Sequence, residues 1–231
     1  MASERAAEST VAIVLAAGAS SRMDGEDKLW ADLDGRPVIA RSIEAMAGIE
    51  GVSVLVIVAP SRHHDALRAF VPDGIKARCI EGGERRRDSV AEGLAATPDA
   101  KWVLVHDGAR PLASTELASR VLTAAWKHGA AVPAVPVADT IKRADAEGRV
   151  VETVPRAGLR AVQTPQAFEG LLLRRAHTAT VEDATDDAEL VERLGEPVWL
   201  VEGEPSNVKI TRPADLVVAR ALLAMAGRER G

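Results

Sequence analysis

The chain has 231 residues, of which 47% are hydrophobic and 27% charged, as expected for a protein with one sizeable core. The net charge is −5, from 29 basic and 34 acidic side chains, whereas duplex-DNA binders usually carry a basic excess. A single cysteine, Cys79, excludes an intramolecular disulfide and disfavours a four-ligand zinc site. The N-terminal residues lack a signal-peptide core, and no apolar run approaches the ~18 residues of a membrane span. We therefore expect a cytoplasmic protein that binds neither nucleic acid nor membrane.

Apolar runs rich in β-branched residues alternate with helical patterns over residues 11–137. The periodicity predicts strands over 11–16, 52–59, 77–81, 102–106 and 130–137, and helices over 37–49, 64–70, 89–97 and 114–128, the last capped by Ser114. Continuous apolar strands separated by helices indicate an α/β fold with a mostly parallel sheet and helices on both faces. Such sheets bind ligands beyond the carboxyl ends of their strands, where the loops 17–27, 82–88 and 107–111 should meet.

The pattern changes after residue 138. Two short alternating stretches, 139–142 and 149–154, predict a hairpin with its turn near 145–148. Because a lone hairpin is only marginally stable, we expect residues 139–156 to form a protruding arm that packs on a second subunit. The rest of the chain is expected to complete a single domain over residues 1–231, with strands at 161–164 and 198–201, a segment at 207–210, and helices at 168–178, 185–194 and 213–225.

The first candidate site is the turn from Leu15 to Met23, where small residues follow a strand and precede two cations, Arg22 and Lys28. Small residues let the backbone approach a polyphosphate, and successive N–H groups can form an anion-binding concavity. The two cations would supply positive charge where negative charge develops. The same pattern also fits a plain strand-to-helix turn with two solvated cations. It matches neither the dinucleotide-binding glycine motif nor the kinase-like P-loop.

The second candidate site is the segment from Val105 to Pro111, at the end of a buried strand. Asp107 could hold Mg²⁺ against phosphate oxygens, or it could cap the following turn. Arg110 could contact a phosphate or form a structural ion pair. His106 is expected to pack within the strand rather than to bind a ligand.

The third cluster is the run Gly82-Gly-Glu-Arg-Arg-Arg-Asp-Ser89. Its paired glycines suggest that a ligand such as a nucleobase approaches the backbone closely, although three arginines in an acidic protein also fit a solvated face. Ser89 is expected to cap the next helix and to touch a ligand. Farther along, Lys209 lies in an apolar context just before a helix capped by Thr211, which is unusual for a surface lysine.

In this order, these segments resemble the 2-C-methyl-D-erythritol 4-phosphate cytidylyltransferase family. The matching segments span residues 11–220 and are LAAGASSRM with Lys28, EGGERRRDSV, VHDGARP, ADTIKR, QTPQAF, TDDAELVE and SNVKITRPADL. The first segment is shared by many sugar-phosphate nucleotidyltransferases, whereas the combination of the later ones is narrower. The resemblance implies a Rossmann-like sheet, a homodimer formed through the arm, and Mg²⁺ dependence. It also implies that CTP and methylerythritol phosphate are joined with release of pyrophosphate, in isoprenoid precursor biosynthesis.

The resemblance also implies roles for individual residues. Arg22 and Lys28 match residues that stabilise the transition state, and Asp107 matches the metal-associated aspartate. Arg156 and Lys209 match residues that position the methylerythritol phosphate, with Arg156 reaching the other subunit's site. Other substrate contacts are expected at Ala16, Ala17, Gly18, Gly82, Gly83 and Ser89 for CTP, at Thr140 and Thr164 near the acceptor, and at Arg110.

The chain departs from the family pattern at a few positions. The loop between Met23 and Lys28 is one residue shorter than expected, and the usual residues of the family are replaced at Asp27, Leu29, Gly108 and Ser206.

Three alternative functions share part of the pattern. Ribitol-5-phosphate cytidylyltransferases share most of these motifs, and a guanylyltransferase of molybdenum-cofactor synthesis shares only the first loop. A non-catalytic nucleotide-binding domain is the alternative from another class. The joint presence of Arg22, Lys28 and Asp107 favours an active enzyme over it.

Overall fold

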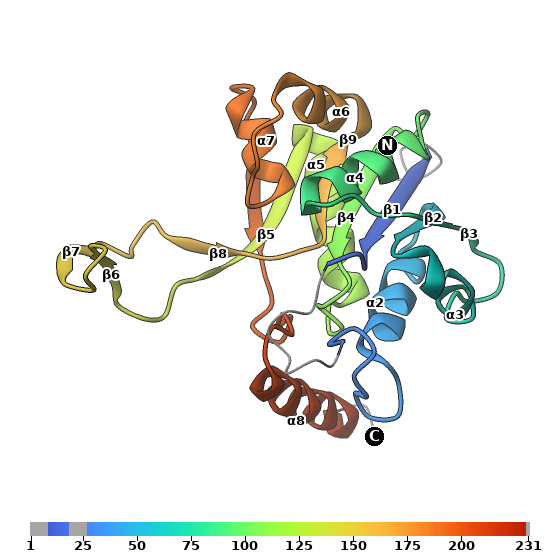
Figure 1. The fold of residues 1–231 in the computed structure, drawn as a ribbon, viewed down its shortest axis with the longest axis horizontal. Coiled ribbons are helices and arrows are strands. Elements are labelled where there is room, and N and C mark those ends of the chain that lie inside the picture. The colour runs from blue at the N-terminus through green and yellow to red at the C-terminus, as the bar shows by residue number, and fades with distance from the viewer. Residues whose placement is uncertain (1–8, 19–26, 230–231) are drawn as a thin grey trace.

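The structure is a computed structural model that describes residues 9–18 and 27–229 and is built on an eight-stranded sheet (Figure 1). The main path of the sheet has the order β10-β5-β9-β4-β1-β2-β3. Parallel pairing joins β1 to β2 and β4, β2 to β3, and β10 to β5. These strands are β1 (Thr10–Leu15), β2 (Val52–Val58), β3 (Lys76–Ile80), β4 (Trp102–Asp107), β5 (Ala130–Pro136) and β10 (Trp199–Glu202). The expected mostly parallel sheet is confirmed.

Two short antiparallel strands complete the sheet. β9 (Gln166–Glu169) lies between β4 and β5 and pairs with both, and β8 (Arg160–Val162) pairs with the end of β5. The sequence prediction that placed Phe168 in a helix was therefore wrong. Phe168 is fully buried in β9, and the helix α6 begins only at Gly170. A strand of four residues is too short to show an alternating period that separates it from the helix that follows.

Helices cover both faces of the sheet, as the sequence predicts. α2 (Val38–Ala47), α3 (His64–Arg68), α5 (Thr115–His128) and α8 (Pro213–Glu229) contribute to one hydrophobic core. α4 (Arg86–Ala95), α6 (Gly170–Ala179) and α7 (Asp187–Arg193) contribute to the other. Along β1 the side chains alternate between these cores, with Ala12 and Val14 in the first and Val11 and Ile13 in the second.

The ends of two helices test the caps that the sequence predicts. Ser114 caps α5 by accepting a hydrogen bond from the Leu117 N–H at 2.9 Å, which confirms the predicted cap. Gly129, at a φ of 88°, ends the same helix in a conformation that suits glycine. Before α8, the Thr211 N–H and hydroxyl both donate to the Asp215 carboxylate at 2.7 Å, so the predicted cap, in which Thr211 would accept a hydrogen bond, is wrong.

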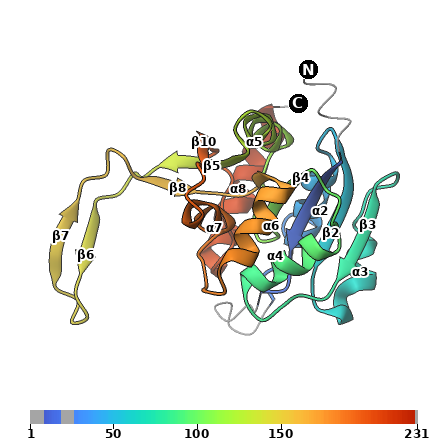
Figure 2. The same cartoon turned by 90° about the horizontal axis from the view of Figure 1, so that it is seen from above.

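A two-stranded hairpin protrudes from the body of the molecule in both views (Figures 1 and 2). Its strands are β6 (Ile141–Ala144) and β7 (Val150–Val154), which pair with each other and not with the main sheet. Val150 and Val151 are 61% and 64% exposed on it. The hairpin lies where the sequence predicts an arm, and its exposed valines give it an apolar surface.

No helix in the described part of the chain is long and apolar enough to cross a bilayer.

Candidate active site

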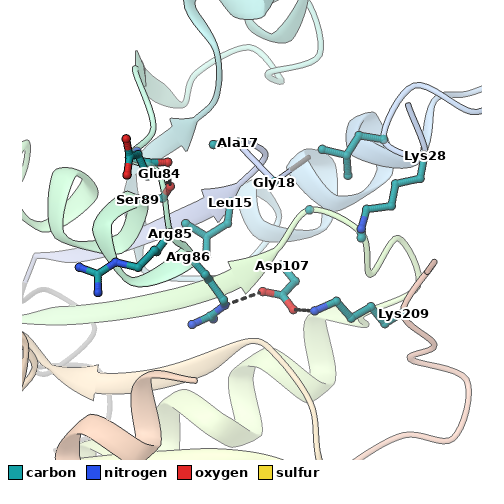
Figure 3. A pocket seen from close by; sticks show the side chains of 14 residues that line it. Leu15, Ala17, Gly18, Lys28, Glu84, Arg85, Arg86, Ser89, Asp107 and Lys209 are labelled. Carbon is teal, nitrogen blue, oxygen red and sulfur yellow. Dashed lines mark hydrogen bonds and ion pairs between the residues drawn. The ribbon is translucent and has the colours of Figure 1, made fainter. Parts of the chain in front are cut away.

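A pocket of about 260 Å³ lies where β1 and β4 end and α4 begins (Figure 3). This first pocket gathers parts of all three candidate clusters and one residue from far along the chain. Its lining includes Leu15, Ala17, Gly18, Lys28, Leu29, Gly83, Glu84, Arg85, Arg86, Ser89, Asp107, Gly108, Ala109 and Lys209. The loops that the sequence analysis expected to meet at this edge of the sheet do meet there.

The glycine pair beside the pocket is explained in part by the protein itself. A Cβ atom on Gly82 would lie 2.3 Å from the Ala17 Cβ, and one on Gly83 would lie 2.4 Å from the Asp88 Cβ. Real Cβ atoms do not approach so closely, so both loops need glycine before any ligand is present. Gly83 lines the first pocket, whereas Gly82 does not. Contacts within the protein therefore explain both glycines, and the close approach of a ligand to them stays a prediction.

Ser89 does not cap α4. The helix begins three residues earlier, at Arg86, and the Asp88 carboxylate accepts the Arg85 N–H at 3.2 Å. Ser89 instead accepts a hydrogen bond from the Gly83 N–H at 3.2 Å and lines the pocket. The prediction that it helps to form the ligand site is still open, and the prediction of a cap is wrong.

Asp107 lies at the centre of the site, at the end of β4. Its Oδ1 pairs with Arg86 Nε at 3.2 Å, and its Oδ2 pairs with Lys209 Nζ at 2.6 Å (Figure 3). Its backbone N–H donates to Thr164 Oγ1 at 3.0 Å. Burial alone would raise the pKa of this carboxyl group, but Arg86 and Lys209 hold the pKa well below its usual range. Asp107 is therefore a permanent anion between two cations.

Lys209 reaches Asp107 because the segment before α8 is fixed against the loop after β4. Ile210 N–H donates to the Ala109 carbonyl at 2.8 Å, and Arg110 Nη1 donates to the Asn207 carbonyl at 2.7 Å. The segment 207–210, expected as an element, has no strand pairing and is held by these contacts instead. The apolar sequence context of Lys209 is thus explained, because its side chain lines the pockets.

Arg86 was not singled out from the sequence, where it is one of three consecutive arginines. In the structure the three have separate partners. Arg85 pairs with Asp88 at 2.7 Å, and Arg87, only 7% exposed, donates to carbonyls at the end of α6 and beyond it. Arg85 and Arg86 both line the pocket, but of the three only Arg86 pairs with Asp107, and it also pairs with Asp187 at 2.8 Å. No sequence signal separates Arg86 from its neighbours, because the direction of each arginine side chain depends on its position at the start of α4.

Thr164 and His106 form a buried link beneath Asp107. Thr164 Oγ1 lies 3.1 Å from His106 Nδ1, and His106 Nε2 donates to the Arg110 carbonyl at 3.2 Å. This geometry suits a neutral imidazole that accepts at Nδ1 and donates at Nε2. Complete burial lowers the pKa of His106 to about 4, although Asp107 nearby opposes that shift. His106 therefore packs and orders the strand end, as the sequence predicts.

The buried neutral His106 should make folding stability depend on pH. Because its pKa falls from 6.5 to about 4 on folding, the unfolded chain binds more protons within this window. The free energy of unfolding should then decrease as the pH falls from 6.5 to about 4, by up to about 3 kcal/mol from this residue. Urea unfolding across this range should show the loss. His106→Gln, which keeps a donor and an acceptor, should be flatter, and an equally steep decline in that variant would contradict the assignment.

A second pocket of about 240 Å³ adjoins the first and shares Arg86, Asp107 and Lys209 with it. Its remaining lining is Arg110, Val162, Gln163, Thr164, Gln166, Thr185 and Asp186. These three shared residues, two cations and one anion, therefore form a charged wall between the two pockets. Such a wall can contact two anionic groups at once, one on each side.

The structure does not bring every predicted site residue to these pockets. Thr140 and Arg156 are exposed at the base of the hairpin, outside both pocket linings, and the Arg156 guanidinium donates to the Ala138 carbonyl. Ala16 is buried just beside the first pocket. Arg22 lies outside the described residues. Lys28, Asp107, Lys209, Arg110 and Thr164 lie in one or both linings.

Two departures from the family pattern have a physical explanation. Asp27 Oδ1 accepts the Leu29 N–H at 3.1 Å, a local turn that can order the chain beside Lys28 in the absence of proline. A Cβ on Gly108 would lie 2.6 Å from the end of Ile39 and 2.8 Å from the Leu15 carbonyl oxygen, so this backbone has no room for alanine.

The described residues contain no group of three or more acidic, histidine or cysteine side chains that could hold a metal ion. Asp107 supplies one carboxylate, and both its oxygens are already paired with cations. Mg²⁺ is commonly held by one or two carboxylates together with substrate phosphates. The residues present therefore do not fit a metal held by the protein alone, and a metal role for Asp107 is still only a prediction.

Comparisons with known proteins show the family of the chain. The profile of the family 2-C-methyl-D-erythritol 4-phosphate cytidylyltransferase matches residues 10–225. The chain belongs to this cytidylyltransferase family. A relative with that name from Dehalococcoides mccartyi is 41% identical over 219 residues, which cover 94% of this chain and 96% of the relative. One from Rhodococcus opacus is 44% identical over 216 residues, which cover 92% and 94%.

Solved cytidylyltransferase structures share the fold. The structure of 2-C-methyl-D-erythritol 4-phosphate cytidylyltransferase from Thermus thermophilus is 39% identical, has a TM-score of 0.76, and aligns over 92% of this chain and 98% of its own. The resemblance inferred from the sequence motifs is confirmed. The family match includes every described site residue from Ala16 to Lys209.

Proposed function

We propose that this protein joins CTP and 2-C-methyl-D-erythritol 4-phosphate, giving the CDP-linked methylerythritol and pyrophosphate. The observation that carries the proposal is the wall of Arg86, Asp107 and Lys209 between two adjoining pockets. A reaction between two phosphorylated molecules needs such an arrangement of charge at their meeting point. Family membership supports the same substrates.

The first pocket suits the nucleotide, and we call it the nucleotide pocket. Its floor is the turn after β1, where the small residues Ala17 and Gly18 leave backbone groups accessible to a polyphosphate. Lys28 lines it from the other side (Figure 3). The second pocket, here the acceptor pocket, adds Arg110 and Thr164 as groups for a phosphate and hydroxyls.

The proposed reaction is an in-line displacement at the α-phosphorus of CTP. A phosphate oxygen of the acceptor forms the new P–O bond, and the bond to pyrophosphate breaks. Because the attacking phosphate is already anionic, no strong general base is needed. The main difficulty is negative charge crowded at one phosphorus, so positioning and cations supply most of the catalysis. Lys28, Arg86 and Lys209 are the cations that line the described pockets closest to this point.

We propose that Mg²⁺ is required and that it arrives with the triphosphate, because the described residues offer no cage for it. The metal would neutralise phosphate charge, while this chain's own residues hold and orient both substrates. Asp107 pairs with two of these residues, Arg86 and Lys209.

We propose that the hairpin joins two subunits into a homodimer. Its exposed Val150 and Val151 would be buried by a partner, and Thr140 and Arg156 at its base lie outside both described pocket linings. A second subunit could bring them to its neighbour's acceptor pocket. A cytoplasmic location is also part of the proposal.

Pyrophosphate release from each NTP with a panel of polyol phosphates and Mg²⁺ tests the function. CTP with methylerythritol phosphate should be fastest, and ribitol phosphate should be a poor acceptor. Faster turnover with ribitol phosphate or with GTP would overturn the substrate assignment. No release with any pair would favour a nucleotide-binding protein without this activity.

A further inference from the structure

A line of paired charges runs from the active site into the interior. Lys209 pairs with Asp107, Asp107 with Arg86, Arg86 with Asp187, and Asp187 with His177 Nε2 at 2.9 Å. The first three of these residues line the pockets. The last two do not, because the Asp187 side chain is 0% and the His177 side chain 4% exposed. The reaction as proposed so far makes no use of this buried pair.

The buried pair of Asp187 and His177 restrains one cation of the wall, Arg86, more than the other, Lys209. Lys209 has one carboxylate partner, and its flexible side chain is 39% exposed. Arg86 has two carboxylate partners, which bind different nitrogens of its rigid guanidinium, and is 25% exposed. An incoming phosphate can therefore draw Lys209 away from Asp107 at little cost, whereas moving Arg86 would leave a buried carboxylate unpaired.

Asp187 is itself fixed from several sides. It is the first residue of α7, and the preceding residue, Asp186, caps that helix by accepting the Glu189 N–H at 2.9 Å. Asp186 also accepts a hydrogen bond from Gln166 in β9 at 2.7 Å, which ties α7 to the central sheet. Because the Asp187 carboxylate only accepts, His177 Nε2 carries the hydrogen that is donated to it, and His177 Nδ1 has no hydrogen-bond partner among the described residues.

We propose that Asp187, held by His177, is a positioning residue that fixes Arg86 as the stationary cation between the nucleotide and acceptor pockets. This inference rests on the proposed function for the identity of the two ligands. Arg86 contacts substrate phosphate from a constant position, and Lys209 is the cation that moves. Asp187 acts only through Arg86 and never touches a substrate.

A double-mutant cycle tests the role. Asp187→Asn keeps the shape and removes the charge, and it should lower kcat/KM for CTP on the order of 10²-fold, the cost of a misplaced catalytic group. Arg86→Lys keeps the charge but cannot bridge two carboxylates, and it should lower kcat/KM similarly. If Asp187 acts through Arg86, adding Asp187→Asn to Arg86→Lys should change kcat/KM by less than about threefold. Losses that multiply in the double variant would overturn the proposal.

A neighbouring buried arginine provides the control for a purely structural role. Arg87 holds carbonyls at the end of α6, close to His177, but does not line either pocket. Arg87→Lys should lower Tm and leave kcat/KM within about threefold of wild type. If it lowers kcat/KM as much as Asp187→Asn at an equal loss of Tm, Asp187 serves only the packing of α6 and α7.

Two further measurements keep the test decisive. If Asp187→Asn fails to fold, His177→Leu takes its place in the cycle. His177→Gln, which retains a donor, should then recover most of the activity. Equal activity of the two His177 variants would overturn the proposal. The same cycle is measured on the Kd of pyrophosphate by calorimetry. Pyrophosphate binding without turnover of CTP and methylerythritol phosphate would reject the proposed function, and non-additive effects on that Kd would still support the role of Asp187.

Discussion

Lys28→Ala should lower kcat by about 10²–10³, while the Kd for CTP changes far less. Lys28 lines the nucleotide pocket together with Arg86, Asp107 and Lys209. A cation there matches the charge that accumulates on the transferring phosphorus better than the charge of bound CTP, so its loss is felt mainly in the transition state. Single-turnover kinetics and calorimetric binding of CTP separate the two effects.

Two variants serve as controls for this result. Lys28→Arg keeps a cation and should retain more activity than alanine, although its planar head does not reproduce the ammonium geometry. Lys76→Ala removes an exposed lysine on β3, away from both pockets, and should leave kcat unchanged. If Lys28→Ala also leaves kcat unchanged, the segment after β1 is only a strand-to-helix connection. Arg22→Ala is expected to behave as Lys28→Ala does.

The sequence predicted the parallel strands and the larger helices well, because these elements carry strong periodic signals. Continuous apolar runs such as Val52–Val58 are buried on both faces of the sheet, and α5 has both a serine cap and a glycine stop. The carboxyl-end rule also predicted that the loops carrying Ala17, Gly83 and Asp107 meet, and these three residues line one pocket. Local sequence signals were therefore sufficient to predict these elements.

The remaining errors occurred where the tertiary structure decides. β9 is recognisable only through its neighbours β4 and β5, since four residues carry too little pattern. α4 begins at Arg86, where the Asp88 carboxylate accepts the N–H of Arg85, and arginine is not a usual cap residue. Asp187 could be found only by following Arg86, which lies 101 positions away in sequence. Contacts of that range leave no trace in one sequence.

Arg156 lies at the base of the hairpin, and the expected dimer would place it in the site of the second subunit. Arg156 follows β7 directly, and its guanidinium donates to the Ala138 carbonyl at the other side of the hairpin base. Neither described pocket includes it. If the hairpin packs on a second subunit, Arg156 would complete that subunit's acceptor pocket. Lys28, on the body of the molecule, would still serve its own site.

Mixed dimers distinguish the two arrangements. Lys28→Ala and Arg156→Ala homodimers should each be nearly inactive, because every site lacks one residue. In a mixed dimer, one site takes Lys28 from the Arg156→Ala subunit and Arg156 from the Lys28→Ala subunit, and the other site carries both defects. With random exchange of equal amounts, half of the dimers are mixed and half of their sites are intact. Activity should therefore rise to about a quarter of wild type.

Subunit exchange must be measured in the same sample, for example by native mass spectrometry of the two variants at different isotopic mass. A second mixture, of Lys28→Ala with Lys209→Ala, is the matched control. Lys28 and Lys209 line one pocket of one chain, so each site of that mixed dimer still lacks one of them. That mixture should stay at the level of its inactive parents. If exchange is complete and the Lys28→Ala and Arg156→Ala mixture also stays there, Arg156 serves its own subunit, and the hairpin does not complete the neighbouring site.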